Sequence, residues 1–296
     1  MGFTINTNTA SNNAYRNLTL NQNAQSKSLE KLSSGLRINR AADDAAGLAI
    51  SEGLKNQVSG MTQAARNAQD GISVIQTAEG ALIEVHSILN RVRDLAVQAG
   101  NDSNNADSRT AIQTEVAALG AELTRIGTST NFNGIDLLKS TDDTGATSVP
   151  KELTFQIGAG GVDTNDQIKV KLVDIAAVGA AVTALAAGDA VAVPPVAAGF
   201  GDAASALTTI TALDGHIKDI STARSELGAS QNRLESTIKS LNVSIENLSS
   251  AGSRIRDTDM ASEMANFTRS QILSQAGTAM LSQANQMNSG VMQLLQ

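Results

Sequence analysis

No cysteine occurs among the 296 residues, which excludes disulfide bonds, thiolate metal ligands and cysteine nucleophiles. Histidine is almost as scarce, and both copies, His86 and His216, fall within or beside helical patterns of apolar residues. We expect structural or solvated roles for the two histidines. The sequence therefore predicts no metal site, no cofactor and no enzyme activity.

The chain also lacks the features of nucleic-acid-binding and membrane proteins. Its aromatic residues are one tyrosine and five phenylalanines, too few for a platform on which bases stack, and its net charge of −7 opposes nucleic-acid binding. No apolar run approaches the roughly 18 residues of a membrane span. The first residues show no basic segment followed by an apolar one, so we expect no cleavable signal.

All three prolines lie between two long stretches in which apolar residues recur at helical heptad spacing. The first stretch slips by one three-residue step at Ala78 and contains Leu54, Val58, Met61, Ala65, Ala68, Ile72, Ile75, Leu82, Val85, Leu89, Val92, Ala96 and Ala99. The second contains Ile210, Leu213, Ile217, Ile220, Leu227, Leu234, Ile238, Leu241, Ile245, Leu248 and Ile255. Such patterns predict long helices packed side by side, the first from about Asp44 to Ala99.

Residues 1–40 and 260–296 carry thinner stripes among many asparagine, glutamine, serine and threonine residues. The stripe positions are Tyr15, Leu18, Leu29, Leu32 and Leu36 at one end, and Met264, Phe267, Leu273, Ala276, Met280, Ala284, Met287, Val291 and Leu294 at the other. Isolated helices of this kind are marginal in water, because a narrow stripe cannot offset the chain entropy. We expect both segments to be disordered in the monomer and to fold on association.

The middle of the chain changes character after a polar break at 101–105 and a further helical pattern over about 106–126. Apolar and polar residues alternate over 153–157 and again over 168–172, which predicts a β-hairpin. Residues 175–205 are a low-complexity run of alanine, valine and glycine, which we interpret as a loose excursion. The predicted fold is mainly α: an elongated antiparallel helical bundle or coiled coil formed by both chain ends, with a small central β-hairpin region.

Two short motifs are weak signs of ligand binding. The glycine-rich run 158–161 follows a predicted strand, but a second strand follows it where a phosphate site needs a helix, so a hairpin loop is favoured. The run 142–145, Asp-Asp-Thr-Gly, lacks the spaced ligands and the closing glutamate of a calcium loop.

Several longer motifs lie in the two end regions of the chain. They are Leu-Ser-Ser-Gly-Leu-Arg-Ile-Asn-Arg-Ala-Ala-Asp-Asp-Ala-Ala-Gly-Leu-Ala-Ile-Ser at 32–51, Leu-Asn-Arg-Val-Arg-Asp-Leu-Ala-Val-Gln at 89–98, Asn-Phe-Asn-Gly-Ile at 131–135, Leu-Gly-Ala-Ser-Gln-Asn-Arg at 227–233, Gln-Ile-Leu-Ser-Gln-Ala-Gly at 271–277 and Gln-Ala-Asn at 283–285. Together these motifs are similar to those of bacterial flagellin. The resemblance covers about 1–140 and 206–296.

The resemblance implies a subunit that polymerises into the flagellar filament for motility. Residues 1–40 and 260–296 would form the inner core, 41–140 and 206–259 a long-helix outer core, and 141–205 the hairpin with a short variable segment at the surface. It also implies export, unfolded, through the flagellar secretion channel to an extracellular location. The implied partners are copies of the same chain, an export chaperone at the C-terminal helix, filament cap and hook-associated proteins, and the host Toll-like receptor for flagellin.

The resemblance also implies roles for individual residues. Receptor contacts fall on Arg91, Leu95 and Glu115, whereas the residues alone favour an ordinary exposed Arg91–Glu115 ion pair with Leu95 in the helix seam. Candidate O-glycan sites are Thr144, Thr147, Ser148, Thr183 and Ser205. Polymerisation is assigned to Leu18, Leu29, Leu32, Leu36, Leu273, Met280, Met287, Val291 and Leu294.

Two other functions remain open from the sequence. One is a hook-associated filament junction protein, which has similar ends but joins or caps the filament. The other is a cytoplasmic coiled-coil scaffold.

Overall fold

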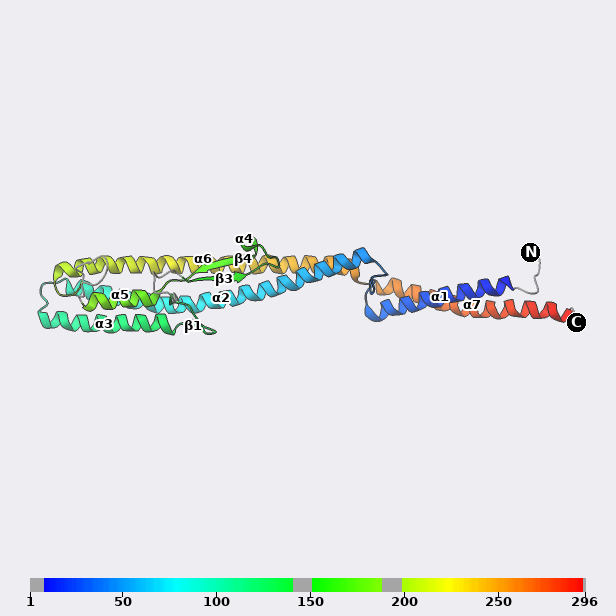
Figure 1. The fold of residues 1–296 in the computed structure, drawn as a ribbon, viewed down its shortest axis with the longest axis horizontal. Coiled ribbons are helices and arrows are strands. Elements are labelled where there is room, and N and C mark those ends of the chain that lie inside the picture. The colour runs from blue at the N-terminus through cyan, green and yellow to red at the C-terminus, as the bar shows by residue number, and fades with distance from the viewer. Residues whose placement is uncertain (1–7, 141–150, 188–198, 295–296) are drawn as a thin grey trace. The chain divides into compact units, whose positions relative to one another are not determined.

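The computed structural model describes residues 8–140, 151–187 and 199–294, with only the backbone described for 187 and 287–294. The chain divides into a terminal unit, within 1–59 and 245–296, and a central unit, 60–244. The helices and strands are α1 Thr9–Ser34, α2 Ala45–Ala99, α3 Ala106–Ser129, β1 Asn131–Phe132, β2 Ile135–Asp136, β3 Glu152–Gln156, α4 Asp163–Asp166, β4 Gln167–Lys171, α5 Ile175–Ala187, α6 Ala203–Arg256 and α7 Met260–Leu294 (Figure 1).

An asparagine or aspartate side chain caps the start of each of the six long helices. The carboxylate or amide oxygens of these residues accept hydrogen bonds from backbone N–H groups of the first turn, which otherwise have no partner. The capping residues are Asn8, Asp44, Asn105, Asp174, Asp202 and Asp259. The predicted starts of the second and third helices, near Asp44 and Ala106, are therefore confirmed and have a local cause.

In the terminal unit, α1 packs antiparallel against α7 (Figure 1). Asn8 Nδ2 donates to the carbonyl oxygen of Ala284 at 3.0 Å, and at the other end Leu36 forms an isolated β-bridge with Asp257. Between these two points, Leu18 lies beside Gly277, where an added Cβ would be 3.4 Å from Leu18 Cδ1. The pair is thus held at both ends by backbone or amide hydrogen bonds.

A clasp of backbone hydrogen bonds joins the segment after α1 to the segment before α7. Gly35 ends α1 with φ +73°, a left-handed conformation that favours glycine. Its carbonyl oxygen accepts from the Thr258 N–H at 3.0 Å, and the Arg37 N–H donates to the Arg256 carbonyl oxygen at 2.6 Å. Ile38, the residue after Arg37, is 1% exposed, so its burial adds a hydrophobic contact to these hydrogen bonds.

One hydrophobic core fills the central unit and draws on α2, α3, α5, α6 and the β3–β4 hairpin. The predicted seam of α2 is fully buried from Ile75 onward: Ile75, Ala78, Leu82, Val85, Leu89, Val92, Ala96 and Ala99 are at most 1% exposed. Before the slip Ala68 is also buried, whereas Leu54, Val58, Met61, Ala65 and Ile72 are half-buried. Leu213, Ile220, Leu227 and Leu234 contribute the corresponding residues of α6. Toward the terminal unit, Leu241 and Ile245 are only half-buried, in contrast to full burial at Leu234.

The predicted hairpin is confirmed as an antiparallel pair, β3 and β4, with Leu153 opposite Val170 and Phe155 opposite Ile168. Ile157, Ile168, Val170 and Leu172 are buried, while Leu153 and Phe155 pack at the margin of the core. The glycine-rich loop 158–161 wraps around Asp166, whose carboxylate accepts the Val162 N–H at 2.9 Å. A carboxylate inside the loop opposes phosphate binding, so the interpretation as a hairpin loop holds.

The interpretation of 175–205 as a loose excursion is wrong for its first part, which forms α5. This helix packs on α3, and Ile175 and Val182 are fully buried. Glycines permit the close approach: a Cβ at Gly127 would be 2.6 Å from the Ala176 backbone nitrogen, and one at Gly179 would be 2.5 Å from that of Thr124. An alanine-rich run has high helix propensity, and this contact with α3 supplies its partner.

Candidate assembly and recognition surfaces

The seam between α1 and α7 is made mainly of small and polar residues. On α7 the half-buried positions advance by alternating steps of four and three: Glu263, Phe267, Ser270, Ser274, Gly277, Leu281 and Ala284. On α1 the seam includes Ser11, Ala14, Leu18, Asn21, Gln25 and Ser28. The contact therefore buries little apolar surface, and the area buried largely determines how much such a contact stabilises.

Five large apolar side chains of α7 lie outside this seam, although Phe267 and Leu281 belong to it. Met260, Met264, Ile272, Leu273 and Met280 are 45–66% exposed, and we call these five residues the outer face of α7. At about 100° per residue they spread over an arc of about 220° around the helix. A single flat partner cannot cover such an arc, so the outer face presents contact surface in more than one direction.

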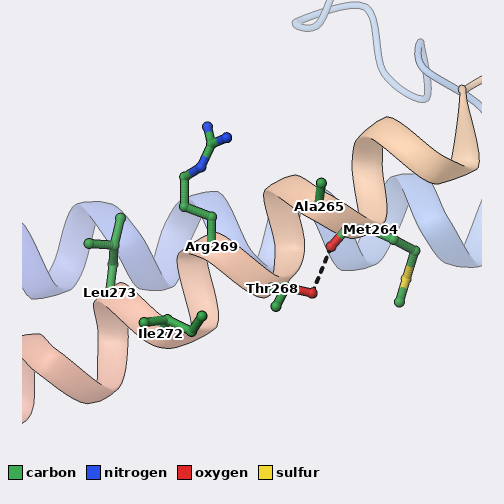
Figure 2. Close-up of a pocket in the computed structure, with 6 residues that line it drawn as sticks. All are labelled: Met264, Ala265, Thr268, Arg269, Ile272 and Leu273. Carbon is green, nitrogen blue, oxygen red and sulfur yellow. Dashed lines mark hydrogen bonds between the residues drawn. The ribbon is translucent and has the colours of Figure 1, made fainter.

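A shallow groove of ≈520 Å³ runs along part of the outer face. It is lined by Met264, Ala265, Thr268, Arg269, Ile272 and Leu273. Figure 2 shows these side chains along one stretch of α7, where the Thr268 hydroxyl donates to the Met264 carbonyl oxygen at 2.9 Å. With its own hydroxyl satisfied inside the helix, Thr268 leaves the groove predominantly apolar.

The predicted polymerisation residues divide between seam and surface. Leu18 is 8% exposed and belongs to the seam, and Leu32 and Leu36 are half-buried. Leu29, Leu273 and Met280 are exposed, as are Tyr15 and Leu20 on α1. Met287, Val291 and Leu294 lie outside the residues whose side chains are described. The sequence stripes missed Ile272, because they traced a single narrow line along α7.

Arg91 and Glu115 form an ion pair that bridges α2 and α3 in the central unit. The Arg91 Nε and Nη2 atoms both donate to Glu115 Oε1, at 3.0 and 2.7 Å, and both side chains are about half exposed. Leu95, in contrast, is 2% exposed and belongs to the hydrophobic core. Leu95 packs the seam, and Arg91 and Glu115 are the accessible pair, so the receptor role of Leu95 stays a prediction.

The two histidines are half-buried on α2 and α6. Burial lowers the pKa of His216, although the nearby Asp219 carboxylate opposes that shift. Among the described residues, no cluster of histidine, aspartate and glutamate side chains could hold a metal ion. Within the same residues, no helix is both long and apolar enough to cross a membrane.

The two candidate glycan residues that the structure describes have hydroxyl groups that already donate hydrogen bonds. Thr183 Oγ1 donates to the Gly179 carbonyl oxygen at 2.9 Å and lies in the tight α3–α5 contact. Ser205 Oγ donates to the Asp202 carbonyl oxygen at 3.0 Å at the start of α6. Thr144, Thr147 and Ser148 lie outside the described residues. The contact with α3 leaves no space for a glycan on Thr183.

Comparison with known proteins gives two family matches and several full-length relatives. Residues 5–143 match the bacterial flagellin N-terminal helical region, and residues 210–295 match the bacterial flagellin C-terminal helical region. A flagellin of Halalkalibacterium halodurans is 50% identical over 98% of this chain and 99% of its own length. A flagellin of Bacillus subtilis is 47% identical over 98% and 99%.

Two further comparisons concern a filament protein and a solved structure. The flagellar filament 31.3 kDa core protein of Treponema maltophilum is 45% identical over 92% of this chain and 93% of its own length. A crystal structure of Bacillus cereus flagellin aligns with a TM-score of 0.45 at 30% identity, and the alignment covers 60% of this chain and 88% of that one.

Proposed function

The chain belongs to the bacterial flagellin family and is a structural subunit of the flagellar filament, not an enzyme; from this premise we propose that its subunits join through the outer face of α7. The observation that carries the proposal is the inverted distribution of side chains in the α1–α7 pair. Small and polar residues make up most of the internal seam, and five large apolar residues of α7 face outward. Exposed apolar surface of this kind marks a site of protein association.

The same inversion supports the proposal that α1 and α7 become ordered only on assembly. A seam of serine, asparagine, glutamine and glycine gains little from burial, so the isolated pair has little to offset the entropy of ordering about 60 residues. Contacts on the outer face would add the missing stabilisation. Leu29, Met280 and the other exposed residues would then be buried by neighbouring subunits.

A single substitution tests the joining surface. Ile272→Gln keeps helix propensity but removes an exposed apolar side chain, and Gln271→Asn alters the adjacent exposed polar residue as a matched control. We expect Ile272→Gln to raise the subunit concentration needed for salt-induced assembly, measured by sedimentation and electron microscopy. Assembly of both variants at the wild-type concentration would reject the outer face as the joining surface.

Truncation tests the order of the terminal segments. We expect removal of residues 1–40 or 260–296 to leave a folded, soluble monomer that cannot polymerise, measured by circular dichroism and sedimentation. Filaments formed by the truncated chain would contradict the assignment of α1 and α7 to assembly.

We further propose that the subunit leaves the cell unfolded through the flagellar secretion channel and acts outside the cell. Marginal terminal helices and the absence of disulfides favour such a route, since both lower the barrier to threading an unfolded chain. An export chaperone would cover the C-terminal segment before export, and filament cap and hook-associated proteins would meet it afterwards. The test of this route is to detect the intact chain in the culture medium. The chain should be absent from the medium when the flagellar secretion channel is disabled.

A receptor function is proposed for the Arg91–Glu115 pair. Arginine offers a planar fork of five donors to a partner, and both side chains are accessible in the monomer. We expect Arg91→Ala to reduce signalling through the host Toll-like receptor for flagellin in a reporter assay. Arg93→Ala is the matched control, because Arg93 is two residues away and pairs with Asp214 of α6 at 2.6 Å. Equal potency of wild type and Arg91→Ala would remove Arg91 from the receptor site.

A further inference from the structure

Methionine is concentrated on α7. Five of the seven methionines lie between residues 260 and 292, and the three whose side chains are described, Met260, Met264 and Met280, are 48%, 50% and 66% exposed. We propose that these three thioethers are sites of reversible oxidation that control whether a free subunit can assemble. The inference rests on the proposed joining surface, because all three residues belong to the outer face of α7.

The chemistry requires only a peroxide as oxidant. A sulfur lone pair attacks one oxygen of hydrogen peroxide, the O–O bond breaks, and after proton transfer the other oxygen leaves as water. The sulfur is oxidised to the sulfoxide and the peroxide is reduced. The product is polar where the thioether was apolar and flexible, and methionine sulfoxide reductases reverse the change.

The position of Met264 shows why the change would oppose assembly. Its side chain lines the groove with Ile272 and Leu273, and Figure 2 shows its sulfur at one end of this apolar strip. A sulfoxide oxygen there needs a hydrogen-bond donor, yet the Thr268 hydroxyl already bonds within the helix. Arg269 is the other lining residue with side-chain donors, and it lies about 140° around the helix from Met264 at about 100° per residue. Burying the oxidised side chain against a neighbouring subunit would therefore remove a strongly polar group from water, which is costly.

Oxidation would therefore act on the subunit before assembly and be hindered afterwards. In the monomer the three thioethers are open to solvent, whereas in a filament joined through the outer face they would be covered. Met61 provides an internal comparison, because it lies in α2 of the central unit, is half-buried and has no place on the outer face.

The experiment uses full-length monomer and assembled filament treated with the same concentration of hydrogen peroxide, with peptide mass mapping of each methionine. We expect Met260, Met264 and Met280 to be oxidised faster in the monomer than in the filament. We also expect oxidised monomer to lose salt-induced assembly and to regain it after treatment with methionine sulfoxide reductases. A variant with Met260→Leu, Met264→Leu and Met280→Leu should assemble before and after peroxide, while the control Met61→Leu should behave as wild type.

The outcomes separate this inference from the proposed function. Protection in the filament together with normal assembly of oxidised monomer would overturn the inference and leave the joining surface intact. Equal oxidation rates in monomer and filament would overturn the joining surface itself, and with it the inference. Loss of assembly by the peroxide-treated triple variant would place the sensitive group elsewhere and likewise overturn the inference.

Discussion

Arg109 of α3 donates a hydrogen bond of 2.8 Å from Nη1 to the carbonyl oxygen of Ala99, the last residue of α2. Its Nη2 donates to the Asn101 carbonyl oxygen at 3.3 Å, and the residue is 9% exposed. A cation at the C-terminal end of a helix interacts favourably with the negative end of the helix dipole. It also donates hydrogen bonds to carbonyl groups of the last turn, which have no partner within the helix. One side chain thus ends α2 and fixes the turn that leads into α3.

Replacing Arg109 should accordingly destabilise the central unit. Arg109→Met removes the donors but keeps much of the apolar stem, so we expect a loss of about 2–3 kcal/mol in the free energy of unfolding, typical of hydrogen bonds to a charged group. Denaturant unfolding followed by circular dichroism measures it. Arg125→Met, which breaks the exposed pair with Glu122 on the same helix, should cost clearly less. Equal costs would contradict the role assigned to Arg109.

Glycine to alanine substitutions should have opposite signs at two helical positions. At Gly127 the added Cβ would meet the Ala176 backbone at 2.6 Å, so Gly127→Ala should push α5 from α3 and cost about 1–3 kcal/mol. At Gly215 of α6 nothing lies within 4 Å, so Gly215→Ala should stabilise by roughly 0.5–1 kcal/mol through helix propensity. Thermal unfolding of both variants distinguishes them, and a stabilising Gly127→Ala would exclude the tight contact.

Leucines of α6 should differ in cost according to their burial. Leu234 is fully buried, and Leu234→Ala should cost about 2–5 kcal/mol. Leu241 and Ile245 are only half-buried, so their alanine variants should cost less in the monomer. Unfolding of monomeric Leu234→Ala and Leu241→Ala makes the comparison. A larger cost at Leu241 would mean that α6 packs differently near residue 241.

Acid should weaken the start of α6. The Ser205 side chain and the Ser205 N–H, which donates to Asp202 Oδ1 at 2.8 Å, hold the pKa of Asp202 below its ordinary value. A carboxyl with a lowered folded-state pKa contributes stability that is present above its unfolded pKa, about 3.9, and is lost as pH falls through the folded pKa. Asp202→Asn keeps a cap without titrating, so its thermal stability should fall less steeply below pH 4 than that of wild type. Parallel acid profiles would exclude this contribution.

Deletions before and after residue 187 should differ in their effect on the stability of the protein. Removal of the whole segment 176–200 should destabilise the chain, because that segment includes most of α5 and the fully buried Phe200. Gly199 is also tied to α6, since its N–H donates to Thr209 Oγ1 at 3.0 Å. We expect a chain lacking 190–196 to fold and support motility, and a chain lacking 176–187 to lose stability in thermal unfolding. Equal stability of the two deletions would contradict the role of α5.

The long helices and the hairpin were predictable because their patterns are local. Asp44 and Asn105 mark helix starts, the heptads of α2 continue through the slip at Ala78, and strict alternation marks β3 and β4. The helix α5 could not be predicted from the sequence, because a run of alanine, valine and glycine forms a helix only where a partner such as Gly127 of α3 permits close packing.

The candidate surfaces were predictable only in part. The Arg91–Glu115 pair follows from two matching motifs, but the burial of Leu95 depends on how α2 faces the rest of the central unit. The stripes of α1 and α7 were placed on their apolar residues, as in a soluble bundle. Leu18 and Phe267 do lie in the seam, but most seam positions are small or polar, because most of the large apolar residues of α7 face outward.

The contacts at the two ends of the α1–α7 pair have a consequence for chain length. From Asn8 to Leu36 there are 36 − 8 = 28 steps along the chain, and from Asp257 to Ala284 there are 284 − 257 = 27. Because hydrogen bonds join the two segments at both ends, the segments must match in length. A heptad inserted into α1 alone would separate either Asn8 from Ala284 or Leu36 from Asp257. A matching heptad in α7 should restore both contacts, so the beginning and the end of this polypeptide can change length only together.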